Sequence, residues 1–206
     1  MTPCVRLTVL ATTMALVCLP TARAEAAQRS AYRLALWPHE APSPDFSLRG
    51  VDGNARTLAN YRGRIVVVLF GFLHCPDACP TELFRLAQVM KRLGSASRQV
   101  QVLFITLDPQ RDSPAALRNY VRAFDHSFIG LTGSTGEIEQ AANRFAVQYA
   151  RVSQGDDYTI DHSTAIYVFD GRGVLTLVGS LSSPEADLFH DIRELVHGLR
   201  LSTGVH

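Results

Sequence analysis

The stretch that decides the fold is IVVVLFGFLHCPDACPTEL, residues 65–83. Its first part, residues 65–72, is apolar and rich in β-branched side chains, which predicts a strand buried on both faces of a sheet. Residues 81–93 place apolar side chains on one helical face and are followed by Gly94, which predicts a helix. The turn between these two elements holds a pair of cysteines, and a proline follows each of them.

The rest of the chain continues this alternation of strands and helices. The two middle helices have recognisable starts, Ser113 before Pro114 and the capping-box pair Ser134 and Glu137. The predicted elements are a buried strand over 100–107, helices over 113–124 and 134–145, hairpin strands over 164–169 and 174–178, and a last helix over 183–199. The sequence therefore predicts an α/β fold, a mixed sheet flanked by helices with an extra helix before the C-terminal hairpin.

The N-terminal residues predict a secretory leader. A mostly apolar run over 7–19 precedes Ala22, Arg23 and Ala24, so cleavage is expected after residue 24. The run is shorter than the ~18 apolar residues of a usual membrane span, so membrane association is expected only if the leader stays uncleaved. A lipid anchor on Cys18 is disfavoured, because bulky Val17 stands before it. The protein is expected to be exported, either to the periplasm or to the periplasmic side of the inner membrane.

Length and composition predict one domain after the leader. The chain has 206 residues and 47% hydrophobic content, enough for one sizeable core. Residues 25–44 are rich in Ala and Pro and are expected to form a tether or irregular arm, and the domain is expected over 45–206. Without residues 1–24, 18 basic and 19 acidic residues remain, a net charge of −1. This balance argues against nucleic acid as a partner.

Cleavage of the leader leaves two cysteines, Cys75 and Cys79. Pro80 suits the first helical position, so Cys79 is expected at the N-cap, where the helix dipole favours its thiolate. Both side chains are expected to be partly exposed. Their spacing allows either a disulfide or a shared metal ion and does not choose between them. A purely structural staple is disfavoured, because so short a loop would yield less than the ~3 kcal/mol of a 15-residue one.

Two histidines are candidates for a third ligand, although a lone histidine is more often a surface or core residue than a ligand. His162 lies in a segment expected to be a loop leading into the hairpin, and His74 beside Cys75 is a rival. If two thiolates and one imidazole converge, they suit Cu(I), whereas zinc usually takes a fourth ligand. Copper is therefore the expected metal.

Three motifs carry a family resemblance. FGFLHCPDACPTEL (70–83), LDPQRDSP (107–114) and DHSTAIYVFD (161–170) resemble, in order, the motifs of the Sco/SenC family of thioredoxin-fold copper proteins, which act in the assembly of cytochrome c oxidase. The resemblance covers about residues 44–199. One departure is Leu73, where the family commonly has a small hydroxyl residue.

The resemblance implies a thioredoxin-like domain in which Cys75, Cys79 and His162 bind copper as Cu(I) or Cu(II). It also implies a partner, subunit II of cytochrome c oxidase or another copper-transfer protein. The dinuclear copper centre of subunit II needs both metal and reduced thiols.

Two other functions use the same cysteines. The Cys75/Cys79 pair would serve a thiol-disulfide oxidoreductase or a redox sensor, although three residues separate the cysteines where a thioredoxin has two. A peroxidase is a third reading, by fold analogy alone. Among the secondary candidates, Asp108 and Arg111 are expected to form an ion pair that orders a loop, and Asp77 to cap a turn or tune the thiols.

Overall fold

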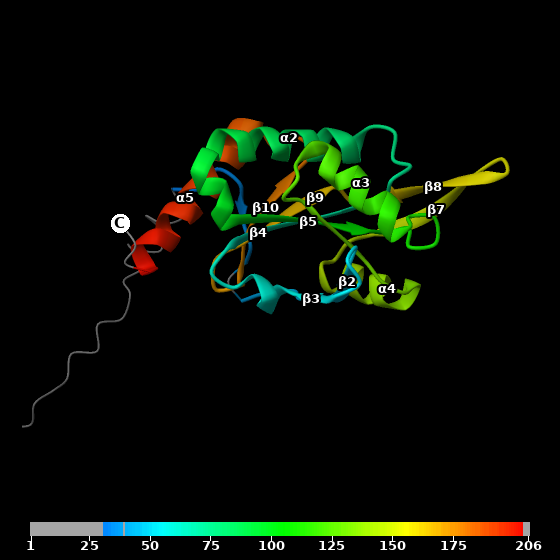
Figure 1. Cartoon of the computed structure of the whole chain (residues 1–206), viewed down its shortest axis with the longest axis horizontal. Helices are drawn as coiled ribbons and strands as arrows, with labels where there is room; N and C mark the ends of the chain where they lie inside the picture. The colour runs from blue at the N-terminus through cyan, green and yellow to red at the C-terminus, as the bar shows by residue number, and fades with distance from the viewer. Residues whose placement is uncertain (1–30, 39, 204–206) are drawn as a thin grey trace, which may run out of the picture.

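The computed structural model describes residues 31–38 and 40–203. The predicted leader, residues 1–24, lies outside this part of the chain. An eight-stranded mixed sheet forms the centre of the molecule (Figure 1), with the strand order β1-β10-β9-β4-β5-β6-β2-β3. The strands are β1 (Ala35–Leu36), β2 (Ser47–Gly50), β3 (Ala55–Thr57), β4 (Ile65–Gly71), β5 (Val100–Thr106), β6 (Ile129–Thr132), β9 (Ala165–Phe169) and β10 (Leu175–Ser180). The helices are α2 (Ala78–Leu93), α3 (Pro114–Phe124), α4 (Thr135–Arg144) and α5 (Glu185–Thr203), with short 3-10 helices at Leu58–Tyr61 and Gly94–Gln99.

The middle of the sheet is parallel and its flanks are antiparallel. β4 pairs with β5 and β5 with β6 in parallel, whereas β9, β10 and β1 continue the sheet antiparallel on the other side of β4. All seven residues of β4 and of β5 are buried, because helices cover both faces of the sheet at this point. The predicted α/β mixed sheet and the extra helix before the C-terminal hairpin, α4, are confirmed.

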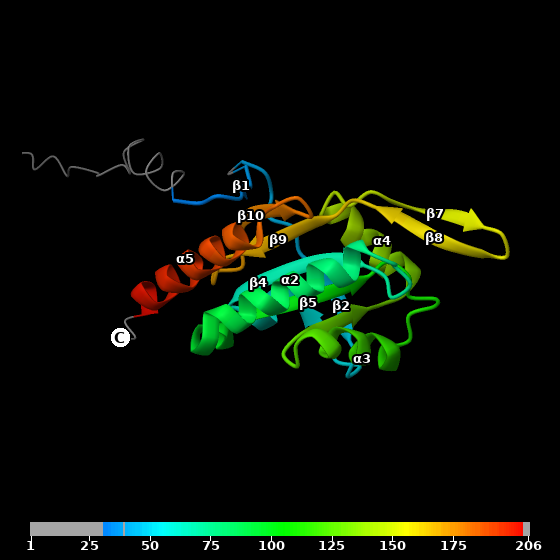
Figure 2. The same cartoon turned by 90° about the horizontal axis from the view of Figure 1, so that it is seen from above.

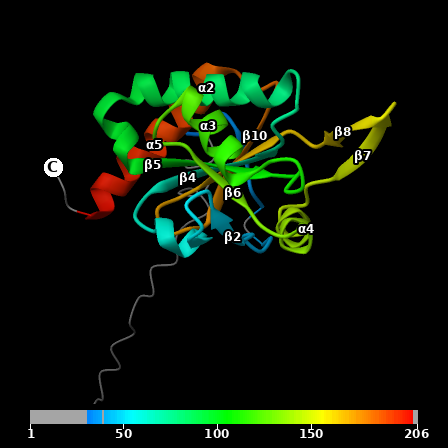
Figure 3. The same ribbon diagram turned by 45° about the vertical axis from the view of Figure 1, so that its right-hand side comes forward.

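The two faces of the sheet belong to two separate cores. Helices α2, α3 and α5 pack on one face together with Ile65, Val67 and Leu69 of β4. Helix α4 and the first 3-10 helix cover the other face, where the alternate β4 residues Val66 and Val68 point. The same separation of α2 and α3 from α4 is visible in Figure 3. β4 therefore ends between two well-packed layers, which fix the start of the loop that follows it.

Two features of the fold differ from the prediction. The segment expected as an irregular arm adds β1 to the edge of the sheet by pairing with β10, and Leu34 beside it is buried. The segment expected as a loop before the hairpin is instead a two-stranded ribbon, β7 (Tyr149–Gln154) and β8 (Asp157–His162). The ribbon pairs only with itself and extends away from the large sheet (Figures 1 and 2).

Within residues 31–38 and 40–203, no helix is both long enough and apolar enough to cross a membrane.

Candidate metal centre

The cysteine loop connects the end of β4 to the start of α2. Asp77 is the N-cap of α2, and the first helical hydrogen bond runs from the Thr81 N–H to the Asp77 carbonyl over 3.1 Å. Cys79 is therefore the second residue inside the helix, and its predicted N-cap position is wrong. The reason is that Pro80 occupies the first turn, where N–H groups have no intrahelical acceptor, so its missing N–H costs no hydrogen bond.

The free N–H groups of this first turn face Cys75. The Cys79 N–H donates to the Cys75 Sγ over 3.4 Å, and the Cys75 N–H donates to the Phe72 carbonyl over 3.3 Å. The Cys75 side chain is partly exposed, whereas Cys79 is only 3% exposed. The expectation that both cysteines are partly exposed thus fails for Cys79. Both are free thiols in the structure.

Gly71, the last residue of β4, makes room for the buried sulfur. A Cβ at this position would lie 2.5 Å from the Cys79 Sγ and 2.9 Å from two ring carbons of Phe104. Real Cβ atoms do not approach other heavy atoms so closely, so only glycine fits here without movement. Sequence reasoning missed this residue, although a glycine inside the run IVVVLFGF is itself a signal of close approach.

His162 reaches the cysteines from the end of β8. Its Nε2 lies 3.8 Å from the Cys79 Sγ, and its ring packs edge-on against Phe72, with the centroids 6.0 Å apart. The Nδ1 lies 3.0 Å from the Ser163 carbonyl oxygen. A carbonyl only accepts hydrogen bonds, so Nδ1 carries the proton and the lone pair of Nε2 faces the sulfurs. This tautomer leaves Nε2 free to bind a metal ion.

The three side chains form one compact donor group. The two Sγ atoms and one imidazole nitrogen all lie within 4.8 Å of one another. Bonds of about 2.0–2.3 Å, the lengths these donors make to zinc, would place the atoms of a planar three-ligand site about 3.5–4 Å apart. The separation of Cys79 and His162 already falls in this range, so the geometry requires only small shifts to hold an ion. Two soft thiolates and one imidazole make a group suited to copper.

The two thiols differ in acidity. A hydrogen bond from the Cys79 thiol lowers the pKa of Cys75 to about 5, with further help from the Cys79 and Asp77 backbone N–H groups. The same hydrogen bond, together with burial, raises the pKa of Cys79 well above its usual value. The thiolate therefore sits on Cys75, and not on Cys79 as the helix-dipole argument predicts, because the Cys79 thiol donates to Cys75 and the Cys79 N–H points at the same sulfur. Metal binding through both sulfurs would release the Cys79 proton.

This difference predicts the pH dependence of alkylation. Iodoacetamide is expected to modify Cys75 at a rate that is constant above about pH 7 and falls with a midpoint near pH 5. Cys79 is expected to stay unmodified in the native protein, because it is buried and protonated. Mass spectrometry of the peptide containing both cysteines after timed labelling across pH 4–9 measures both rates.

The control for this experiment is Cys79→Ala, which removes the thiol that donates to Cys75 and keeps the backbone N–H. In this variant the midpoint for Cys75 is expected to rise toward the ~8.5 of a free thiol. A midpoint above pH 8 in the parent protein would show that the Cys75 thiolate is not stabilised in this way.

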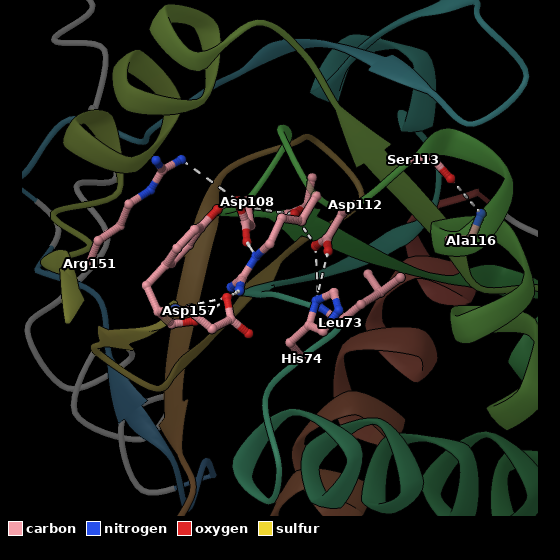
Figure 4. A network of polar contacts seen from close by, with 11 residues as sticks. Leu73, His74, Asp108, Asp112, Ser113, Ala116, Arg151 and Asp157 are labelled. Carbon is pink, nitrogen blue, oxygen red and sulfur yellow. Dashed lines mark hydrogen bonds and ion pairs between the residues drawn. The ribbon is translucent and has the colours of Figure 1, made fainter. Parts of the chain in front are cut away.

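The other candidate residues lie outside the donor group. Asp77 is exposed and accepts a hydrogen bond from the Thr81 hydroxyl over 3.2 Å. His74 is not part of the donor group, and its Nδ1 lies 3.8 Å from Asp112 (Figure 4). The ion pair predicted between Asp108 and Arg111 is present, and it also involves the ribbon.

Sequence reasoning missed two residues near the site besides Gly71. Asp112 is fully buried and accepts a hydrogen bond from the Leu73 N–H over 3.1 Å. Tyr158, on β8, donates its hydroxyl proton to Asp108 over 2.8 Å. Both contacts join segments more than 35 residues apart in sequence, since the two separations are 39 and 50. A buried carboxylate within LDPQRDSP leaves no local pattern that would reveal its partner.

The sequence of the chain is similar to those of mitochondrial SCO proteins. The mitochondrial SCO2 homologue of Mus musculus is 43% identical over 136 residues, covering 64% of this chain and 53% of that protein. The mitochondrial SCO1 protein of Saccharomyces cerevisiae is 40% identical over 132 residues, covering 62% of this chain and 45% of that protein. The chain thus spans about half the length of these curated relatives.

Two solved structures with bound copper have the same fold. Arabidopsis thaliana ScoI with copper bound has a TM-score of 0.71 and 32% identity, covering 77% of this chain and 99% of that chain. Yeast Sco1 with copper bound has a TM-score of 0.69 and 35% identity, covering 76% of this chain and 89% of that chain. The thioredoxin-like fold expected from the resemblance is confirmed by these neighbours. Residues 38–197 match the SCO1/SenC family model, and the chain belongs to this family.

Proposed function

We propose that the protein is an exported copper chaperone that binds copper through Cys75, Cys79 and His162. Its cargo would go to the dinuclear copper centre of cytochrome c oxidase subunit II, or to another copper-transfer protein. The observation that carries the proposal is the convergence of two sulfurs and the lone pair of one imidazole nitrogen within 4.8 Å. The copper-bound relatives from Arabidopsis thaliana and yeast support the choice of metal.

The exposure of the three ligands supports transfer rather than permanent storage. Cys79 is buried, whereas Cys75 and His162 are partly exposed. Three ligands leave copper with room for a further donor, so an incoming thiolate of the recipient can bind before a ligand of this chain leaves. The exposed ligands are released first and the buried sulfur last.

A second candidate is a thiol-disulfide oxidoreductase that reduces the cysteines of the recipient site. Two adjacent free thiols, one of them acidic at Cys75, favour it. In that reaction the Cys75 thiolate attacks the partner's disulfide, and Cys79 then displaces the partner from the mixed disulfide. The partner receives two electrons, and Cys75 and Cys79 become a disulfide.

One transfer experiment separates the two functions. The chain from Glu25 onward, reduced and loaded with one equivalent of Cu(I), is mixed without oxygen with the metal-free, reduced copper domain of subunit II. Most of the copper is expected to be on the partner after the proteins are separated and analysed for metal. The His162→Ala variant is expected to load less copper and to deliver less.

The second arm uses the oxidised partner domain and copper-free chain. Rapid appearance of partner thiols, unchanged in His162→Ala, together with no copper transfer in the first arm, would replace the chaperone with the oxidoreductase. The double variant Cys75→Ser, Cys79→Ser is the control for both arms, because it retains His162 and lacks both sulfurs.

A further inference from the structure

The loop between β5 and α3, residues 107–113, contacts both segments that carry the candidate ligands. In Figure 4, Asp112 lies near Leu73 and His74 of the cysteine loop, whereas Asp108 lies on the side of Arg151 and Asp157 of the ribbon. This loop contains most of the motif LDPQRDSP. The donor group itself uses none of its residues.

The first contact holds the cysteine loop. The Asp112 Oδ2 accepts the Leu73 N–H over 3.1 Å and the Thr106 hydroxyl over 2.6 Å. The Asp112 side chain is fully buried, so these bonds are shielded from water. Leu73 is two residues before Cys75, and its backbone direction sets where the Cys75 loop begins. Asp112 thereby ties the start of the cysteine loop to the end of β5.

The second contact holds the ribbon. The Arg111 guanidinium lies over the Tyr158 ring, 3.6 Å from its centroid. Its Nη1 donates to the Tyr158 carbonyl over 2.8 Å and to the Asp157 carboxylate over 2.7 Å. The Arg111 Nε and the Tyr158 hydroxyl both donate to Asp108, which is fully buried. Arg151 of β7 adds a further ion pair to Asp108 over 3.7 Å.

The ribbon depends on such contacts for its orientation. β7 and β8 hydrogen-bond to each other and not to the large sheet, and a two-stranded hairpin alone is marginally stable in water. Tyr158, Ile160 and His162 alternate along β8 and so share the face that turns toward the body. Ile160 is buried in the second core, and Tyr158 is held by Arg111. His162, at the end of the same face, takes its direction from these two anchors.

We infer that Arg111 and Asp112 are positioning residues that act as a bracket: through neighbouring side chains of one loop, they fix the His162 ribbon relative to the cysteine loop. This inference rests on the proposed copper site. It deepens that proposal, because it states how two ligands separated by 83 residues, Cys79 and His162, are kept 3.8 Å apart. Arg111 acts on the histidine side and Asp112 on the cysteine side.

The role of Arg111 in holding the ribbon can be measured in the metal-free protein. Arg111→Gln removes the charge and most of the hydrogen-bonding fork, so hydrogen–deuterium exchange is expected to increase in residues 149–162 of the metal-free protein and stay unchanged in β4. The exposed Arg122→Gln on α3 is the matched control and is expected to leave both regions unchanged. Arg111→Lys, which keeps the charge without the planar fork, is expected to give an intermediate effect.

The second experiment measures the Cu(I) affinity of Arg111 and Asp112 variants, each with and without the His162→Ala change. Arg111→Gln is expected to weaken Cu(I) binding about 10-fold or more, as loss of an outer-shell partner does, but to have little further effect in a His162→Ala background. Asp112→Ala is expected to weaken binding in both backgrounds, because it acts through Cys75. Affinities come from anaerobic competition with a Cu(I) chelator of known affinity.

Two results would overturn the bracket. One is that Arg111→Gln leaves the hydrogen–deuterium exchange of the ribbon unchanged. The other is that Arg111→Gln lowers the Cu(I) affinity equally with and without His162. If the parent protein fails to bind Cu(I), the proposed function fails, and the exchange experiment still decides whether Arg111 holds the ribbon.

Discussion

Cys79→Ser is expected to lower the affinity for Cu(I) by about 100-fold or more. Loss of an outer-shell partner typically costs ~10–100-fold, and Cys79 would itself be a ligand. The other cysteine of the described residues, Cys75, already belongs to the donor group, so no further thiolate there can replace the Cys79 sulfur. The hydroxyl of serine is a hard donor that suits Cu(I) poorly. Anaerobic competition with a Cu(I) chelator measures the loss.

Cys75→Ser separates the loss of copper affinity from the loss of stability. Both variants are expected to lose copper affinity, but only Cys79→Ser is expected to cost about 1–3 kcal/mol of unfolding free energy, because it buries a hydroxyl at a 3% exposed position. Cys75 is partly exposed, and its replacement is expected to leave stability nearly unchanged. A Cys79→Ser protein whose Cu(I) affinity stays within about threefold of the parent's, a difference below ~1 kcal/mol, would show that this sulfur is not a copper ligand.

Gly71→Ala is expected to damage stability and copper binding together. The added methyl would lie 2.5 Å from the Cys79 Sγ and 2.9 Å from the buried Phe104 ring, so both side chains must move. Overpacking of this kind costs about 1–3 kcal/mol of unfolding free energy. The displaced sulfur no longer faces His162, and Cu(I) affinity is expected to fall at least about 10-fold, as for a disturbed ligand shell. Chemical unfolding and chelator competition measure the two losses.

Gly136→Ala in α4 is the matched control for this variant. A Cβ at Gly136 would meet no atom within 4 Å, and alanine favours a helix over glycine by up to about 1 kcal/mol. This variant is expected to be slightly more stable than the parent and to bind copper equally well. If Gly71→Ala behaves like Gly136→Ala, the close approach at the end of β4 does not constrain the sulfur.

Much of the fold follows from local patterns in the sequence. The β-branched run of β4 and the capping box of Ser134 and Glu137 predict elements that the structure contains almost at the predicted residues. The ribbon is different, because five of the six β7 residues are exposed and their pattern shows no buried face. Its strand pairing joins only β7 and β8, so neither strand is marked by the burial that identifies the central strands.

The candidate site was also predictable only where local sequence patterns determine it. The two cysteines stand at the end of a recognisable strand, whereas the placement of His162 depends on long-range contacts of Tyr158 and Ile160 with other elements. The low pKa of Cys75 also depends on tertiary detail, since it follows from which of the two sulfurs accepts the hydrogen bond of the other thiol and that of the Cys79 N–H. A residue pattern cannot specify this choice, because both cysteines stand before a proline.

X-ray absorption spectroscopy of the Cu(I)-loaded protein decides whether Cys75, Cys79 and His162 hold one copper ion. The expected result is one copper per chain in a three-coordinate site with two sulfur donors and one imidazole nitrogen, and loss of the nitrogen contribution in His162→Ala. A copper environment with no sulfur donor, or one that is identical in the parent and His162→Ala, would contradict it.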